Sequence, residues 1–256
     1  MENILVDLIG TTQIITINRP EYENKLNRLC MEELTIAMKE AETASICRAI
    51  ILTGNGAYFC NGGELGDFRT QSSLQIREFG ERFIRLHTTI TNLTKPVVAA
   101  VQGHALGGGF SLVEACDLAV AVTGATFGTP EIHAGIAPMM ALTGVARLMK
   151  RKKAMEMAWL GESFSAKEAQ ELGLVNWLVE PESLLETTIG LCKRLAEYNP
   201  TALALCKGLY QDLDGLNYER QLKSGLQMLV SLLKSVDASE ALTAKEEQRL
   251  PRWQGQ

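Results

Sequence analysis

The sequence predicts an α/β core followed by a mostly helical C-terminal part. Segments typical of strands and helices alternate over the first half of the 256 residues. After about Pro138 the pattern changes to helices, and no Pro-, Gly- or Ser-rich linker separates the two parts. We therefore expect a core over residues 1–195 and a helical region over residues 196–256 that packs on the core or on a neighbouring molecule.

The composition indicates a soluble, folded protein. Hydrophobic residues make up 46% of the chain and charged residues 21%, which is enough for a large core. The net charge of −5 argues against a nucleic-acid or anionic-membrane partner. The apolar run Val97–Val101 is too short for a membrane span, and the first residues do not resemble a signal peptide. The six cysteines form no C-x-x-C pair, so we expect buried free thiols and a cytoplasmic location.

The elements of the first half follow from short apolar patterns. Ile14–Ile17 is rich in β-branched residues and predicts a strand, which ends at Pro20. Between Leu29 and Thr43 the apolar residues recur at helical spacing. Further elements are expected over Ala49–Leu52 (strand), Leu74–Leu93 (helix), Val97–Val101 (strand), from Phe110 onward (helix) and over Leu118–Val122 (strand).

Two signals define helices in the second half. Ser165–Glu168 reads S-A-K-E, a capping box that predicts the start of a helix. A later helix carries an apolar stripe that must be buried somewhere. The stripe consists of Tyr218, Leu222, Leu226, Leu229, Val230 and Leu233.

Three glycine-rich stretches, Gly54–Gly56, Asn61–Gly63 and Gly103–Gly109, are candidates for chemistry. A dinucleotide fingerprint that starts at Gly54 would need a small residue where Phe59 stands. The chain has no Gly-Lys-Ser/Thr to end a P-loop. Its three histidines have no metal-site spacing, so no metal is expected.

Backbone N–H groups are what these glycine loops can offer. A glycine run that opens a helix leaves N–H donors free at the positive end of the helix dipole. Gly63 and Gly108 are therefore candidates to hold a developing oxyanion. Taken by spacing alone, such runs are more often tight turns or close packing contacts.

Longer motifs carry a resemblance to a known family. Gly54–Leu65 resembles the pattern G-x-G-x-x-F-x-x-G-x-D-L, and Lys95–Gly109 resembles K-P-x-I-A-A-V-x-G-x-A-x-G-G-G. Thr129–Glu131 and Glu162–Val179 follow in the order that the same family shows. The chain thus resembles the enoyl-CoA hydratase/isomerase (crotonase) family over nearly its whole length.

The resemblance implies a fold, a substrate class and an assembly. The fold would be a spiral of ββα repeats with a helical C-terminal trimerisation region, giving a homotrimer or homohexamer. The substrate would be an acyl-CoA thioester of fatty acid metabolism, with coenzyme A as part of the substrate and no separate cofactor. The oxyanion hole of the family maps onto the backbone N–H groups of Gly63 and Gly108.

One departure from the family bears on the reaction. Hydratases of the family typically use two glutamates, of which the second maps to Glu131 and the first to Ser111. A single carboxylate suffices to shuttle a proton during double-bond isomerisation, so isomerisation is the preferred prediction. Hydration with a non-standard partner for Glu131, or a catalytically silent CoA-binding protein, remains the alternative.

Several further residues are candidates on the strength of the resemblance. Ser111 is a candidate catalytic residue through a hydrogen bond to water or substrate, with helix capping as the alternative. Glu114 shares the face of Ser111, where a salt bridge or buried hydrogen bond is expected rather than catalysis. Lys25 and Arg249 are expected to contact the CoA phosphates, since Gln248 replaces the usual lysine. The complete set expected to bind substrate is Lys25, Leu26, Asn61, Gly62, Leu65, Met139 and Arg249.

Overall fold

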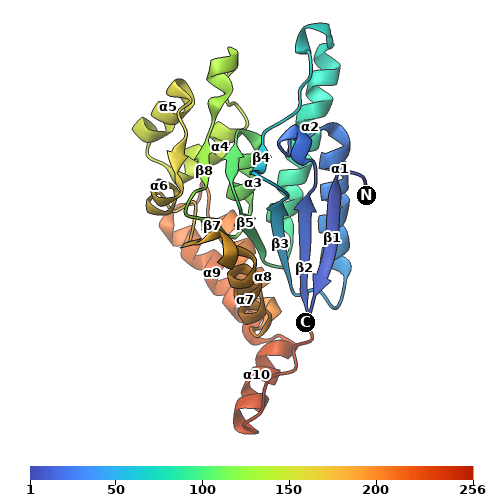
Figure 1. The fold of residues 1–256 in the computed structure, drawn as a ribbon. Coiled ribbons are helices and arrows are strands. Elements are labelled where there is room, and N and C mark those ends of the chain that lie inside the picture. Colours follow the sequence, from blue (N-terminus) through green and yellow to red (C-terminus); the bar gives the residue numbers. More distant parts are fainter. Residues whose placement is uncertain (256) are drawn as a thin grey trace.

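The computed structural model describes residues 1–255 and arranges the strands in two sheets (Figure 1). The larger sheet has six strands in the order β1-β2-β3-β5-β7-β10, and the smaller has four in the order β4-β6-β8-β9. The strands are β1 (Ile4–Ile9), β2 (Thr12–Ile17), β3 (Ala49–Gly54), β4 (Tyr58–Asn61), β5 (Val97–Val101), β6 (His104–Leu106), β7 (Leu118–Val122), β8 (Thr126–Gly128), β9 (Phe164–Ser165) and β10 (Trp177–Val179).

The chain repeats one ββα unit three times. In the pairs β3/β4, β5/β6 and β7/β8 the first strand joins the larger sheet and the second joins the smaller one. The helix α2 (Ser73–Asn92) follows the first pair, α3 (Gly108–Ala115) the second and α4 (Ala141–Leu148) the third. From β2 to β10 the larger sheet is parallel, whereas β1 pairs antiparallel with β2 at its edge. The expected spiral of ββα repeats is therefore confirmed.

The remaining helices complete the core and form the C-terminal part. The short helix α6 begins at the capping box that the sequence predicts, with Ser165 accepting from the N–H of Glu168. The helices are α1 (Arg28–Thr43), α5 (Arg151–Leu160), α6 (Ala166–Glu171), α7 (Leu184–Ala196), α8 (Pro200–Asp212), α9 (Tyr218–Leu233) and α10 (Val236–Glu246), with 3₁₀ turns η1 (Pro20–Tyr22), η2 (Phe68–Thr70), η3 (Pro130–Ala134) and η4 (Pro181–Ser183).

Several strands lie where the sequence analysis expects none, among them β1 and β6. β1 escapes detection because only Ile4 of its six residues is buried, so it lacks the alternation of a half-buried strand. β6 lies within the Gly103–Gly109 stretch that we expected to be only a turn. It forms by pairing in continuous register with β8 and, across a register shift between Tyr58 and Cys60, with β4.

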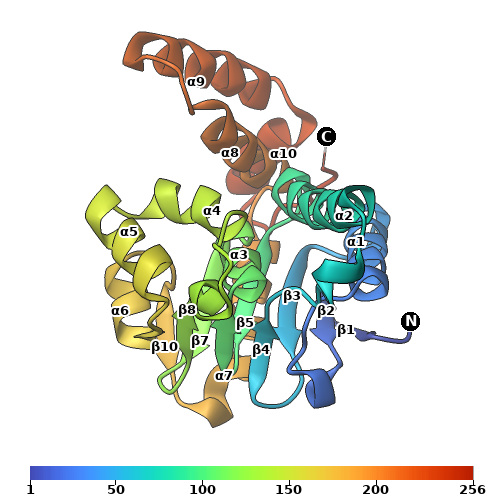
Figure 2. The ribbon, with the colours of Figure 1, turned by 90° about the horizontal axis from the view of Figure 1, so that it is seen from above.

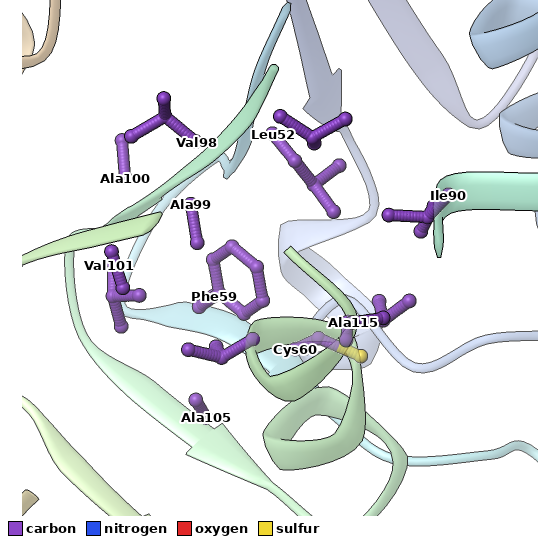
Figure 3. Close-up of a cluster of buried hydrophobic side chains, with 14 of the residues drawn as sticks. Leu52, Phe59, Cys60, Ile90, Val98, Ala99, Ala100, Val101, Ala105 and Ala115 are labelled. Atoms are coloured by element: carbon purple, nitrogen blue, oxygen red, sulfur yellow. The ribbon is translucent and has the colours of Figure 1, made fainter. Parts of the chain in front are cut away.

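A buried apolar cluster holds α3 against the strands (Figure 3). Leu52, Phe59 and Ala105 are fully buried there, and Ala115 from α3 lies beside them. A methyl group built on Gly109 would lie 2.0 Å from the carbonyl oxygen of Cys60, so this helix packs directly on β4. The close packing fixes where the N-terminus of α3 points.

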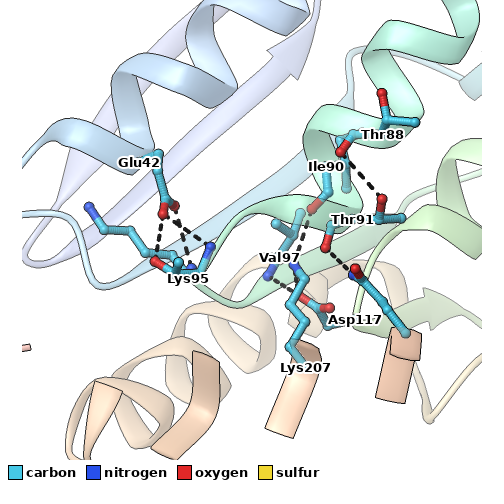
Figure 4. A network of polar contacts seen from close by, with 10 residues as sticks. Glu42, Thr88, Ile90, Thr91, Lys95, Val97, Asp117 and Lys207 are labelled. Atoms are coloured by element: carbon cyan, nitrogen blue, oxygen red, sulfur yellow. Dashed lines mark hydrogen bonds and ion pairs between the residues drawn. The ribbon is translucent and has the colours of Figure 1, made fainter. Parts of the chain in front are cut away.

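The helices α8 and α9 stand apart from the sheets (Figure 2). One lysine links α8 to the core: Lys207 Nζ lies 2.9 Å from Asp117 and donates to the carbonyl of Ile90 at 3.0 Å (Figure 4). Asp117 also accepts from the N–H of Val97 at 2.8 Å. No residue of α9 is buried, and its predicted apolar stripe is exposed in the single chain.

Cysteine exposure departs in part from the expectation. All six cysteines are free thiols, and Cys30, Cys47, Cys60 and Cys192 are buried. Cys206, by contrast, is exposed on α8 because that helix buries none of its residues. Within residues 1–255, no helix combines the length and the apolar character that crossing a membrane requires.

Candidate active site

The second and third glycine loops meet at the N-terminus of α3. A methyl group built on Gly62 would lie 3.4 Å from the backbone nitrogen of Gly108, and one built on Gly108 would lie 3.4 Å from Cα of Gly62. Gly107 donates its N–H to the carbonyl of Gly128 at 2.8 Å, which ties this loop to β8. Two loops that are 46 positions apart in the chain are thus in backbone contact.

Leu26 anchors the loop that contains Gly63. Its N–H donates to the carbonyl of Gly62 at 2.8 Å, and its carbonyl accepts from the N–H of Glu64 at 2.9 Å. Gly63 lies between these two fixed peptide groups, and Gly108 is the first residue of α3. Within residues 1–255 the N–H of neither glycine donates to a protein acceptor. The structure therefore leaves two immobilised donors free.

Two phenylalanines of α2 cover these glycines. A methyl group on Gly63 would lie 3.1 Å from Cζ of Phe79, and one on Gly108 would lie 2.9 Å from Cε2 of Phe83. Phe79 and Phe83 are one helical turn apart, so they share a face of α2. The sequence analysis did not identify them, although their spacing of four residues is a visible signal. A side chain at either glycine would therefore crowd one of these rings.

Glu131 lies against the same loop. Its Oε1 would be 2.7 Å from a methyl group on Gly107, whose φ of +53° also favours glycine. Its Oε2 is buried and has no hydrogen-bond partner within residues 1–255. Burial raises the pKa of the Glu131 carboxyl above its ordinary value, opposed only by a contact with its own backbone. A carboxyl group whose pKa is raised in this way holds a proton more readily, which suits a group that both accepts and returns one.

Ser111 lies on the buried side of α3, 3% exposed. Its hydroxyl lies 3.5 Å from the carbonyl of Gly107, one turn earlier in the helix. The N-cap of α3 is Gly107, so the alternative of a capping role for Ser111 is wrong. No carboxylate stands at position 111, and Glu131 is the carboxylate that packs against the glycine loop.

Glu114 corrects another expectation. No cation or hydrogen-bond donor meets its carboxyl within residues 1–255, and its Oε1 is buried without a partner. A methyl group on Gly144 would lie 2.2 Å from Oε2, so the carboxyl packs against the backbone of α4. Burial raises the pKa of Glu114 to about 9, which leaves it uncharged at neutral pH. The expected salt bridge or hydrogen bond is absent because the apolar packing around Glu114 supplies no donor.

The residues expected to bind substrate near β4 form a small polar group. Lys25 Nζ lies 2.7 Å from Glu23, and the Asn61 amide donates to the same carboxylate at 2.6 Å. Leu65 is half-buried, and its carbonyl accepts from the side chain of Gln71. The structure brings this group to the strand that precedes the glycine loop.

Arg249 and Met139 are the remaining residues expected to bind substrate. Arg249 follows α10, which in Figure 1 projects away from the region of α3. Its guanidinium is already paired with Glu240 at 2.5 and 3.0 Å and with Glu247 at 2.5 Å. Met139 is 69% exposed, and Met140 is the methionine that lines the nearby cavity.

A cavity of about 730 Å³ opens beside Ser111, between the core and α8. Residues from α2, α3, α4 and α8 line it, among them His87, Ser111, Glu114, Met140, Lys207 and Tyr210. His87 continues the face of α2 that carries Phe79 and Phe83, and its ring stacks on Phe83 with centroids 4.1 Å apart. Over residues 1–255, no group of three or more His, Cys, Asp or Glu is arranged to hold a metal ion.

Comparison with known proteins places the whole chain among close structural relatives. The family described as enoyl-CoA hydratase/isomerase matches residues 10–256. A short-chain-enoyl-CoA hydratase of Clostridium acetobutylicum is 31% identical, covering 97% of this chain and 96% of that protein. A probable enoyl-CoA hydratase of Bacillus subtilis is 34% identical, covering 95% of each. The crystal structure of an enoyl-CoA hydratase from Bacillus anthracis aligns with a TM-score of 0.92 and 30% identity over 99% of this chain and 100% of that chain.

Proposed function

Since the chain belongs to the enoyl-CoA hydratase/isomerase family, we propose that it is an enzyme that acts on an acyl-CoA thioester. The observation that supports this proposal is the pairing of two free backbone donors with one buried, unpaired carboxyl oxygen. Gly63 and Gly108 supply the donors, and Glu131 supplies the carboxyl group. Lys25 and Asn61 are proposed to contact the CoA portion from the end of β4.

The thioester carbonyl oxygen would accept from both glycine N–H groups. Removal of a proton from C2 then moves negative charge onto this oxygen, where the fixed donors stabilise it. A single donor of this kind contributes about 3 kcal/mol to the transition state. The phenyl rings of Phe79 and Phe83 exclude water from the two donors and so strengthen both hydrogen bonds.

Glu131 would carry the proton. As the base it takes the C2 proton of a 3-enoyl thioester, and the C–H electron pair forms a C1=C2 bond while the carbonyl pair moves onto the oxygen held by the glycines. The oxygen pair then re-forms the carbonyl, the C1=C2 pair becomes the C2=C3 double bond, and the former C3=C4 pair takes the same proton from Glu131 at C4. No second carboxylate and no water enter this sequence, which fits a serine at position 111.

Hydration is the second candidate, and the names of the relatives favour it. Both relatives described above carry the name enoyl-CoA hydratase. Glu114 follows Ser111 by three residues and lies on the same face of α3, so it is the available partner for Glu131. Burial raises the pKa of Glu114 to about 9, so in a hydration it would donate the proton to C2 while Glu131 activates the water. Isomerisation stays our preferred proposal because it needs Glu131 alone.

One assay separates the candidates. The protein is incubated in D₂O with a 3-enoyl-CoA and, separately, with the 2-enoyl-CoA of the same length, and products are followed by ultraviolet absorbance and mass spectrometry. Isomerisation gives the conjugated thioester with no added oxygen. Hydration gives a product heavier by one water. Binding of every thioester in a panel without turnover would identify a silent CoA-binding protein and contradict the proposal.

Position 111 offers a gain-of-function test. Ser111→Glu restores two carboxylates, and like-charge repulsion raises the pKa of one of them, as an acid–base pair requires. We expect hydration of 2-enoyl-CoA to appear or to rise, while Ser111→Gln, with nearly the same volume, gives none. Wild-type hydration at a rate that Ser111→Glu does not exceed would show that another residue already fills this role.

A further inference from the structure

Arg19 is a buried charged residue that the proposed reaction does not use. It lies between β2 and η1, and only 7% of its surface is exposed. Burying a cation is costly unless hydrogen bonds and an opposite charge compensate for its lost hydration. The partners of Arg19 therefore show which part of the molecule its side chain holds.

The guanidinium of Arg19 bridges two segments of the chain beside Gly63. Its Nη1 donates to the backbone carbonyl of Lys25, and its Nη2 lies 2.9 Å from Oε2 of Glu64. Lys25 directly precedes Leu26, which anchors the glycine loop, and Glu64 directly follows Gly63. One side chain thus ties together the chain before the anchor and the chain after the oxyanion donor.

The backbone of Arg19 closes the turn that leads to Lys25. Its N–H donates to Oδ1 of Asn24 at 2.9 Å, and its carbonyl accepts from the N–H groups of Tyr22 and Asn24 at 3.0 and 2.9 Å. The turn contains two consecutive left-handed residues, Glu23 and Asn24, with φ of 55° and 54°. The Tyr22 ring also faces the guanidinium, whose central carbon lies 4.8 Å from the ring centroid. These contacts keep the guanidinium and the Lys25 carbonyl in a fixed relation.

Two hydrogen-bonded peptide groups lead from Arg19 to the oxyanion donor. The Lys25 carbonyl and the Leu26 N–H belong to one planar peptide group. The Gly62 carbonyl and the Gly63 N–H belong to another. The first group donates to the second, because the Leu26 N–H lies 2.8 Å from the Gly62 oxygen. Both peptides are trans, so their C=O and N–H point in opposite directions, and a hydrogen bond at one end sets the direction of the other.

The positive charge at the start of this series strengthens the donor at its end. A cation that donates to a peptide carbonyl draws electron density from that peptide group, so its N–H becomes a stronger donor to the next carbonyl. The first hydrogen bond is charge-assisted, and such bonds are about twice as strong as neutral ones. The Gly63 N–H is the last group of the series, and it is the one that faces no protein acceptor within residues 1–255.

We propose that Arg19 is a positioning residue that directs and polarises the Gly63 N–H through two peptide groups, with Glu64 fixing the guanidinium. The inference rests on the proposed function, since it concerns a donor that holds the thioester oxygen. Arg19 itself does not touch the substrate. Its effect grows as negative charge develops on the oxygen, so it acts on the transition state more than on the binding of the thioester.

The carbonyl stretch of a bound thioester reports the strength of the hydrogen bonds to its oxygen. A saturated acyl-CoA labelled with ¹³C at C1 is bound to the wild type and to Arg19→Met, and its infrared band is compared with that of the free thioester. We expect the wild type to lower the frequency of the band and Arg19→Met to lower it less. On the thioester that the wild type converts, kcat of Arg19→Met should be about tenfold lower, with KM within about twofold of the wild type.

The outcomes distinguish this inference from the proposed function. If Arg19→Met binds the thioester and lowers the frequency as much as the wild type does, the inference is wrong and the proposed function stands. If the wild type itself does not lower the frequency, Gly63 and Gly108 hold no thioester oxygen, and the proposed function is contradicted as well.

Two carboxylate variants keep the test decisive if Arg19→Met does not fold. The Glu64 side chain is 39% exposed, so Glu64→Ala releases the guanidinium without emptying the core. The infrared band should move in the same direction as in Arg19→Met, and kcat should be about threefold lower. Glu32→Ala is the matched control, because the Glu32 side chain is 46% exposed and pairs with Arg82 at 2.6 Å between α1 and α2. The same band position in Glu64→Ala and Glu32→Ala would overturn the inference.

Counting the sites separates positioning from folding. Calorimetric titration with the saturated acyl-CoA gives the number of binding sites per chain, so that kcat is expressed per folded site. A loss of kcat in Arg19→Met that disappears after this correction would show that Arg19 only stabilises the fold, and the inference would be wrong.

Discussion

The carboxyl groups beside α3 and those in the C-terminal helices lie in opposite environments: within residues 1–255, the first lack hydrogen-bond partners and the second have several. Beside α3, one carboxyl oxygen of Glu131 and one of Glu114 are buried without a partner, and burial raises the pKa of Glu114 to about 9. Within α10, Glu240 accepts from Arg249 and from the N–H of Arg252, which lowers its pKa to about 2. Asp237, fully buried, accepts from the N–H groups of residues 254 and 255 at 2.7 and 2.9 Å.

The apolar side chains show the reverse contrast. Around α3 they are buried, whereas on α9 Leu222, Leu226 and Leu233 are between 57% and 64% exposed. A buried polar atom without a hydrogen-bond partner indicates a ligand site, and an exposed apolar helix face indicates a protein–protein interface. By this criterion we expect the α3 region to bind a small molecule and α9 to pack against a second chain.

The largest expected effect is on Glu131. Glu131→Gln keeps the shape and removes the base, so turnover should fall about 10²- to 10⁴-fold. Steady-state kinetics on the thioester that the wild type converts provide the measurement, and calorimetry should show that acyl-CoA still binds. Full activity in this variant would mean that an unpaired buried carboxyl does not mark the reaction site.

The pH profile of kcat/KM sharpens the same point. Glu131 must be ionised to act as the base, and its pKa is raised above the ordinary 4.5. Activity should therefore be lost as the pH falls through this raised pKa, with the acid limb above pH 4.5. An acid limb at or below that value would contradict the role of burial.

Gly108→Pro tests the backbone donors. Proline is tolerated as the first residue of a helix but has no N–H, so turnover should fall about 10²- to 10³-fold. Gly108→Ala is the matched control, because it keeps the N–H and adds a methyl group 2.9 Å from Phe83. Circular dichroism should confirm that both variants are folded. Equal losses in the two would show that crowding against Phe83, and not the donor, determines the effect.

On the C-terminal side, Leu226→Arg tests whether α9 is covered by another copy of the chain. We expect the wild type to form a trimer or a dimer of trimers, and the charge to weaken association at least tenfold. Light scattering at micromolar concentration is the measurement. A wild-type monomer of 28.1 kDa would contradict the expectation.

The smallest expected effect is that of Lys207→Met, which removes the ion pair that links α8 to the core. Loss of charge-assisted hydrogen bonds to Asp117 and Ile90 should lower the free energy of unfolding by about 1.5–3 kcal/mol. Denaturant unfolding is the measurement, with Lys223→Met, an exposed pair on α9 with Glu219, as the control. If both variants lose the same free energy, this link is no stronger than a surface ion pair.

The sequence is a good guide to the parts whose signals are local. Helix α1 begins one residue from the expected position, and the strands Val97–Val101 and Leu118–Val122 match in full. β1 is not predictable in this way, because its outward side chains give it no periodic pattern. Its place is set only by pairing with β2.

The candidate site shows the same difference between residues that local motifs identify and contacts that depend on the tertiary fold. The motifs identify Gly63, Gly108 and Glu131, and the structure brings the three to the same pair of loops. That Glu114 lacks a hydrogen-bond partner is not predictable from the sequence. The i, i+3 spacing from Ser111 shows which helix face the two residues share, but not which groups the neighbouring helix places against that face. The ion pairs of Arg249 are likewise made by a fold-back of the chain beyond α10.

The glycine triplet at the start of α3 carries three unrelated constraints in three consecutive letters. Gly107 is restricted by its φ of +53° and by Glu131, Gly108 by the ring of Phe83 and Gly109 by the carbonyl of Cys60, 2.0 Å from any added methyl group. In a library randomised at these positions, replacements at 109 would disappear in a screen for soluble expression. Replacements at 107, and those at 108 that remove the N–H or are larger than alanine, would pass that screen and fail one for turnover. A sequence profile that scores the three glycines as one motif therefore combines one requirement of folding with two requirements of catalysis. Screening the same library for both soluble expression and turnover separates them.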